Sequence, residues 1–153
     1  MKYISTLIAV ADMEKSKKWY ADVLGLEVVA DFGANVTLAG GVVLQTLDTW
    51  KEFIRTDNIL LPNNAYELYF EEESMDDFWK HLKSFDICYV HELFEHRWGQ
   101  RAVRFYDPDK HIIEVGEKLD VVIKRFILQG MSVEETAVRM DIPVDFVRSC
   151  LNK

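Results

Sequence analysis

The sequence predicts an α+β protein made of two successive β-α-β-β-β modules followed by a helical appendage. The main observation is a repeat, because segments with strand alternation and one segment with helical apolar spacing follow each other in the same order twice. When the halves are superimposed, Ser5 aligns with Glu67, Asp12 with Ser74 and Met13 with Met75. The second observation is that after Lys118 the apolar residues take helical spacing only. We therefore predict curled mixed sheets around a shared cavity, with a domain at 1–117 (modules about 1–50 and 64–117) and a helical extension at 118–153.

The clearest signals in the first module mark the two ends of its helix. Asp12 is a natural N-cap, and Gly25 is the residue type that commonly follows a helix end. The pair Gly40-Gly41 predicts a two-residue hairpin between its last two strands. Residues 50–64 are predicted to form a connector with about one helical turn. The predicted elements are a strand at 3–10, a helix at 13–24 and strands at 26–30, 35–39 and 42–47.

The second module repeats this order. Ser74 is predicted to cap a helix, with Asp77 at the reciprocal position of a capping box. Met75, Phe78, Trp79 and Leu82 form its apolar face. The predicted strands are 65–71, 87–94, 100–106 and 111–115.

The extension is predicted to contain three helices. An apolar stripe from Leu119 to Ile127 marks the first, and Gly130 ends it. Ser132 and Glu135 form a capping box for the second, and Pro143 opens the third.

Composition narrows the class of protein. The formal net charge of -8 argues against general affinity for nucleic acid, which needs a basic surface. Cys88 and Cys150 have no metal-ligand spacing and are expected as reduced thiols in a cytoplasmic protein. The N-terminus lacks the pattern of a signal peptide, and no apolar run reaches the roughly 20 residues that span a bilayer.

One strand carries an unexpected charge. Glu114 follows Ile112 and Ile113 and precedes Val115. A carboxylate on a core-facing side of a strand must be paired, hydrogen-bonded or bound to a metal, whereas on the other side it would point into solvent. Residue pattern alone leaves both alternatives open.

Two motifs resemble the vicinal-oxygen-chelate superfamily, which includes glyoxalase I, extradiol dioxygenases and the bleomycin- and fosfomycin-resistance proteins. The first runs from Val10-Ala11-Asp12 through Trp19-Tyr20 to Gly25-Leu26, and the second from Trp98-Gly99-Gln100-Arg101 through Asp107-Pro108-Asp109 to Glu114. The resemblance covers residues 1 to about 117. It implies the paired-module fold, a small-molecule ligand and a homodimer.

The resemblance also implies four inward positions that hold a divalent ion in metal-using members. They fall on Ser5, Gln45, Glu67 and Glu114. Glu114 matches the usual residue type, whereas Ser5 and Glu67 stand where histidine is usual. Strand alternation independently places these four side chains opposite mostly apolar neighbours.

The chemistry of the site has two interpretations. Gln45, Glu67 and Glu114 form an all-oxygen set suited to Mg²⁺ or Mn²⁺, with Ni²⁺ as a further candidate cofactor. Alternatively there is no metal, and the two carboxylates share a proton or pair with Arg101 or Arg104. The lack of histidine at the four positions favours the second interpretation and argues against extradiol dioxygenase chemistry.

The resulting hypothesis is a small-molecule-binding, glyoxalase-like protein. As an enzyme it would be a lyase or isomerase of the lactoylglutathione lyase kind, with Glu114 and Glu67 as catalytic groups. Ser5, Tyr69, Trp98 and Arg104 are its predicted ligand-binding residues. His91 and His96 are expected on the surface or in a loop, and His111 facing away from Glu114.

Two other functions compete with this hypothesis. One is a non-catalytic, ligand-sequestering protein of the drug-resistance type. The other is a ligand-responsive regulator, because residues 129–147 have the pattern of a helix-turn-helix; its near-neutral charge disfavours DNA binding.

Overall fold

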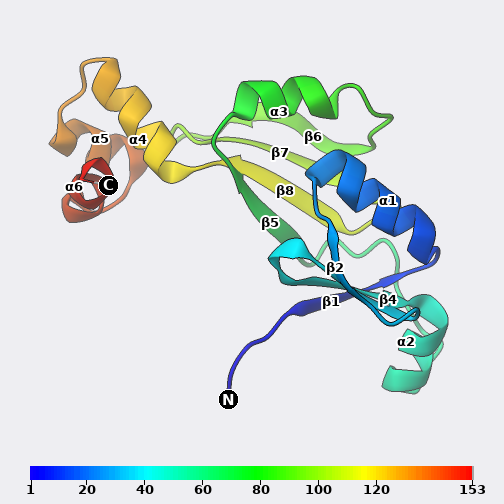
Figure 1. The fold of residues 1–153 in the computed structure, drawn as a ribbon. Coiled ribbons are helices and arrows are strands. Elements are labelled where there is room, and N and C mark those ends of the chain that lie inside the picture. Colours follow the sequence, from blue (N-terminus) through cyan, green and yellow to red (C-terminus); the bar gives the residue numbers. More distant parts are fainter. Residues whose placement is uncertain (153) are drawn as a thin grey trace. The chain divides into compact units, whose positions relative to one another are not determined.

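The computed structural model describes residues 1–152, and the chain divides into two compact units. The first contains residues 1–66 and 106–112, and the second contains residues 67–105 and the chain from 113 onward. Each unit has its own four-stranded sheet (Figure 1). The predicted α+β class with two β-α-β-β-β arrangements and C-terminal helices is therefore confirmed.

The sheet of the first unit has the order β1-β4-β3-β2, in which β1 runs parallel to β4 and the other neighbours are antiparallel. Ala9 lies opposite Gln45 in the parallel pair. Its elements are β1 (Thr6–Val10), α1 (Met13–Leu24), β2 (Val28–Asp31), β3 (Asn35–Leu38), η1 (Ala39–Gly41), β4 (Val42–Thr46) and α2 (Leu47–Ile54).

Helix α1 has the predicted bounds, and both of its ends are capped. The Asp12 side chain accepts a hydrogen bond from the Lys15 amide at 3.0 Å. Gly25 takes the left-handed conformation (φ 67°) and donates to the Ala21 carbonyl. The helix buries Tyr20 and Val23.

Two predictions for this unit are wrong. Gly40 and Gly41 do not form a two-residue hairpin; they belong to the short 3₁₀ turn η1 with φ of 82° and 87°. The positive φ values account for glycine at both positions. The connection between β3 and β4 has three residues, because Ala39 is also part of it. The connector holds more than one helical turn, because α2 has eight residues. The helix also begins earlier than predicted, directly after β4.

The sheet of the second unit has the order β5-β8-β7-β6, and α3 packs on one face of it. The predicted capping box at Ser74 is wrong: the Ser74 side chain makes no capping bond, and Asp77 pairs with Lys80 instead. The Glu72 side chain accepts from the Ser74 amide, so the chain enters the helix by a different local bond. The elements are β5 (Glu67–Glu72), α3 (Met75–Leu82), β6 (Tyr89–Glu95), β7 (Arg101–Tyr106) and β8 (Ile112–Glu117).

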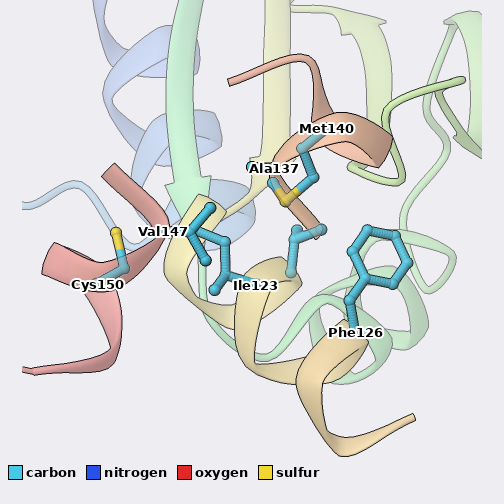
Figure 2. Close-up of a cluster of buried hydrophobic side chains, with 7 residues drawn as sticks. Ile123, Phe126, Ala137, Met140, Val147 and Cys150 are labelled. Carbon is cyan, nitrogen blue, oxygen red and sulfur yellow. The ribbon is translucent and has the colours of Figure 1, made fainter. Parts of the chain in front are cut away.

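The last three helices form a small core of their own within this unit (Figure 2). They are α4 (Leu119–Leu128), α5 (Val133–Met140) and α6 (Val144–Leu151). Figure 2 shows Ile123, Ala137 and Val147 among the side chains that they bury together. The capping box of Ser132 and Glu135 is confirmed.

Helix α4 is tied to the loop between β6 and β7. Arg125 donates to the Gly99 carbonyl at 2.6 Å and pairs with Glu117 at 3.0 Å. A Cβ on Gly99 would lie 2.2 Å from the Phe126 ring, so only glycine lets the helix approach this closely. Within residues 1–152, no helix has the length and apolar content needed to cross a membrane.

Candidate functional site: two carboxylates around Arg104

Three adjacent strands of the second sheet bring Glu67, Arg104 and Glu114 together. Glu67 opens β5, Glu114 lies in β8, and Arg104 lies in β7. The neighbouring side chain of Arg101 points to the other face, where it pairs with Asp76 of α3 at 2.7 Å. Alternation therefore places the cluster on the face away from α3, as the sequence predicts for Glu67 and Glu114.

Arg104 is the centre of this cluster. Its Nε donates to Glu67 Oε2 at 2.8 Å, and its Nη2 forms an ion pair with Glu114 Oε2. Its Nη1 lies 3.2 Å from Nε2 of His91, which faces Arg104 across the antiparallel pair of β6 and β7. One guanidinium thus contacts both carboxylates and an imidazole.

The different surroundings of the two carboxyl groups shift their pKa values in opposite directions. Glu114 is buried, with 6% of its surface exposed, whereas the Glu67 side chain keeps 35%. Burial, together with the hydrogen bond that the protonated Glu114 carboxyl donates to Glu67, raises the pKa of Glu114 to about 7 despite the positive charge of Arg104. The hydrogen bond from Arg104 lowers the pKa of Glu67. Near neutral pH, Glu114 is therefore partly protonated, whereas Glu67 is ionised.

A polar chain runs beside the carboxylates on the same face. Trp98 Nε1 donates to Gln100 Oε1 at 3.1 Å, and Gln100 Nε2 donates to the Tyr69 hydroxyl at 3.2 Å. Gly116 leaves room for this arrangement, because a Cβ there would lie 3.0 Å from the Tyr69 ring. The predicted ligand-binding residues Tyr69 and Trp98 are therefore linked to each other through Gln100.

Aromatic rings continue from this chain. The Trp98 ring stacks on His96 with centroids 4.2 Å apart, and Phe94 connects His96 to His91 through edge contacts. His91 and His96 thus belong to the neighbourhood of Arg104, whereas the sequence favours a surface or loop position for each. The register of β6 on β7, which pairs His91 with Arg104, brings them there.

The remaining predicted positions lie in the first unit. Ser5 precedes β1. Gln45 is buried in β4, where its Oε1 accepts from Asn35 at 2.7 Å and its Nε2 donates to Thr49. Both polar ends of the Gln45 amide therefore have partners inside this unit.

The residues around Glu114 do not fit a divalent ion. A cation bridging Glu67 and Glu114 would compete with the Arg104 guanidinium, which already contacts both carboxylates. Among residues 1–152, no three His, Cys, Asp or Glu side chains converge as ligands. The positive charge in this cluster comes from an arginine.

The other arginine considered for pairing has a different role. Arg101 pairs with the buried Glu117 at 2.9 Å, and Arg125 of α4 pairs with the same carboxylate. Burial opposes the charge on Glu117, but the two guanidinium groups bring its pKa below its ordinary value. This ion-pair network fastens α3 and α4 to β7 and β8.

Comparison with known proteins agrees with the motifs and the fold. Residues 3–120 match the family model described as a glyoxalase-like domain. A protein of unknown function from Agrobacterium tumefaciens str. C58 has a crystal structure that is 33% identical with a TM-score of 0.70, covering 77% of this chain and 94% of that one. No curated protein matches the sequence.

Two further crystal structures share the fold. A lactoylglutathione lyase from Agrobacterium tumefaciens is 22% identical with a TM-score of 0.59, covering 77% of this chain and 94% of that one. A member of the glyoxalase/bleomycin resistance protein/dioxygenase superfamily from Sphaerobacter thermophilus is 24% identical with a TM-score of 0.59, covering 77% and 98%. At these identities, the likeness concerns the fold alone.

Proposed function

Because the chain belongs to the glyoxalase-like domain family, we propose that it binds a small oxygen-bearing molecule at Glu67, Arg104 and Glu114 and moves a proton on it, as a lyase or isomerase. The observation that carries this proposal is the buried Glu114 in contact with both Arg104 and Glu67, with a pKa of about 7. A group with a pKa near the working pH both gives and accepts protons readily.

The proposed reaction starts with a ligand carbonyl near the guanidinium. Ionised Glu114 takes a proton from the hydroxyl-bearing carbon next to the carbonyl; the electron pair of that C–H bond forms a C=C bond, and the carbonyl π pair moves onto the oxygen. Arg104 stabilises the resulting enediolate by its charge. The hydroxyl proton passes to the other oxygen, the hydroxyl oxygen becomes the new carbonyl, and Glu114 returns its proton to the former carbonyl carbon. Glu67 stays ionised and adds to the effect of burial in raising the pKa of Glu114.

We propose that Arg104 takes the place that a divalent ion has in metal-using relatives. The protein purified without chelator is then expected to hold less than stoichiometric Mg²⁺, Mn²⁺ or Ni²⁺, as measured by plasma mass spectrometry. Stoichiometric metal that is lost in Glu114→Gln would contradict this part of the proposal and restore Gln45, Glu67 and Glu114 as ligands.

Proton exchange tests the reaction directly. In D₂O, the protein should catalyse deuterium incorporation next to the carbonyl of dihydroxyacetone or the hemithioacetal of methylglyoxal and glutathione, followed by proton NMR. Glu114→Gln should lower the rate by about 100-fold or more, the usual contribution of a general acid–base group. Glu92→Gln, an exposed carboxylate on β6, is the matched control and should retain the rate. Equal rates for the wild type and Glu114→Gln would refute the proposal.

A sequestering function is the second candidate, and the stacked rings of His96 and Trp98 favour it. A flat ligand would extend this stack without needing a proton transfer. Acridine is a suitable probe. If the protein sequesters flat ligands, acridine should quench the tryptophan fluorescence of the wild type and of Glu114→Gln. It should bind at least tenfold more weakly to Trp98→Leu. Proton exchange would favour the enzyme, whereas acridine binding without exchange would favour sequestration.

Assembly and regulation stay proposals as well. We expect a cytoplasmic homodimer, and sedimentation equilibrium at micromolar concentration tests the dimer. A regulator acting through α4–α6 would have to shift a DNA fragment at low salt, which the charge of this chain disfavours.

A further inference from the structure

We propose a second ligand site, in the first unit, where His111 accepts a hydrogen bond from the hydroxyl of a small neutral phenol. The site is a cavity of about 370 Å³ between β1, α2 and the segment that follows α2. It shares no residue with the cluster around Arg104. The inference therefore goes beyond the proposed function and does not depend on it.

The cavity has an apolar body. Leu7 of β1, Trp50 and Ile54 of α2, and Leu60 of the following segment line it. Ile54 is 37% exposed and Leu60 69% exposed, so the protein leaves part of this lining uncovered. A bound apolar ring would cover this surface and gain the free energy of its burial.

His111 provides a fixed polar group in this lining. The residue is 2% exposed, and its Nδ1 lies 2.8 Å from Asp107 Oδ2. Asp107 Oδ2 also accepts from the buried Tyr20 hydroxyl at 2.8 Å, and its Oδ1 accepts from the His111 amide. A carboxylate that receives these donors also accepts from Nδ1–H, which leaves Nε2 as the acceptor atom that His111 offers a ligand.

The Nε2 atom of His111 is available for a ligand. None of the hydrogen bonds among residues 1–152 uses this atom, and the hydrogen bond from Nδ1 to Asp107 fixes the orientation of the ring. The ring also contacts Tyr66, another residue of the cavity lining, with centroids 6.1 Å apart. An oriented acceptor at an apolar cavity is suited to a ligand with one hydroxyl donor.

The lining also sets the charge and size of the ligand. Besides His111, its polar members are the neutral side chains of Asn58, Asn63 and Tyr66. A charged ligand would lose hydration here without meeting an opposite charge. The volume lies at the lower end of the range for small-molecule sites, which fits a single substituted ring. A monocyclic phenol meets each of these requirements.

Titration with p-cresol tests the site, with toluene as the matched probe that lacks the hydroxyl. In full-length protein labelled with ¹⁵N-histidine, p-cresol should shift the Nε2 resonance of His111 at saturation. Toluene should bind about 5- to 10-fold more weakly, because it cannot make the hydrogen bond. No shift at His111, or equal affinity for both probes, would overturn the proposal.

Three variants test the hydrogen bond to His111, the apolar cavity and the independence of this site from the cluster around Arg104. His111→Phe keeps a ring but removes the acceptor, and should reduce the preference for p-cresol over toluene to about twofold or less. Because this change also removes a partner of Asp107, Ile54→Trp serves as the second variant: it fills the partly exposed end of the cavity and should weaken both probes at least tenfold. Glu114→Gln should bind p-cresol like the wild type. Unchanged binding in Ile54→Trp, or loss of binding in Glu114→Gln, would contradict this location.

Discussion

The two units place a polar residue at the corresponding position of β4 and β8 but satisfy it in different ways. In the first unit, Gln45 is a neutral amide that exchanges hydrogen bonds with Asn35 and Thr49. In the second unit, Glu114 is an acid that shares Arg104 with a second carboxylate. Both residues are buried, so both needed partners during folding.

The two units share an architecture, but the buried polar residue is neutral in the first and titratable in the second. A neutral network has no proton to lose near pH 7, so it gives the first sheet the same stability over a wide pH range. The charged network keeps one proton in a buried place, which costs stability when that proton leaves. Of these two buried positions, only Glu114 in the second sheet therefore exchanges a proton near neutral pH.

The largest effect is expected from removing the cation of the charged network. Arg104→Met keeps the length of the side chain but leaves two carboxylates facing each other, one of them buried. Because Arg104 is partly exposed, we expect the free energy of unfolding at pH 8 to fall by about 2–3 kcal/mol, below the full cost of breaking a buried pair. Urea unfolding at pH 5.5 should show a smaller loss, since the carboxylates protonate. A loss of equal size at both pH values would contradict the electrostatic origin.

The next effect concerns the proton on Glu114. Its pKa is about 7 in the folded state and near 4.5 in the unfolded chain, so folding retains a proton that the unfolded state releases. This contribution to stability is fully present below pH 4.5 and is lost as the pH rises through 7. Glu114→Gln should remove this loss and be more stable than the wild type at pH 8 by about 2 kcal/mol. Parallel pH profiles of unfolding for both proteins would contradict the raised pKa.

A smaller effect is expected in the neutral network. Asn35→Ala leaves the buried Oε1 of Gln45 without its donor and should cost about 1 kcal/mol. Because no ionisable group takes part, the cost measured by urea unfolding should be the same at pH 5.5 and pH 8. A pH-dependent cost would break the contrast between the two units.

The smallest change in stability is expected for Glu67→Gln, which mainly moves a pKa. The variant removes the negative neighbour of Glu114 and leaves Arg104 free to pair with it, so the pKa of Glu114 should fall below its value of about 7. The carboxyl carbon resonance of Glu114, followed by ¹³C NMR against pH, measures this shift. A pKa that stays in place would mean that burial alone sets it.

Local sequence signals predicted helices best where all the partners lie within one turn. Asp12 and Gly25 define α1 to the residue, and the Ser132–Glu135 capping box forms as predicted. Ser74 has the same kind of signal but its side chain makes no capping bond: the Asp77 amide donates to the Ser74 carbonyl, and the Ser74 amide donates to Glu72. A cap pattern thus predicts that a helix begins, whereas competing side chains decide which bond is made.

The site shows a similar division between what the pattern predicts and what the fold adds. Alternation along the strands predicts that Glu67 and Glu114 share a face, because the period of two is a property of the backbone. The motifs likewise identify the family. The strand pattern does not tell whether Arg101 or Arg104 joins the carboxylates, and the structure resolves this by placing Arg101 on the α3 face.

The sequence by itself thus determined the repeat and the class of fold, since these depend on spacing along the chain, and its two motifs pointed to the family by resemblance. Only the tertiary structure decided that an arginine bridges the two carboxylates, that His91 faces it across two strands, and that His111 lines a cavity backed by Asp107 and Tyr20. These contacts join residues far apart in the chain. Their partners follow from strand register and helix packing, which no local spacing records.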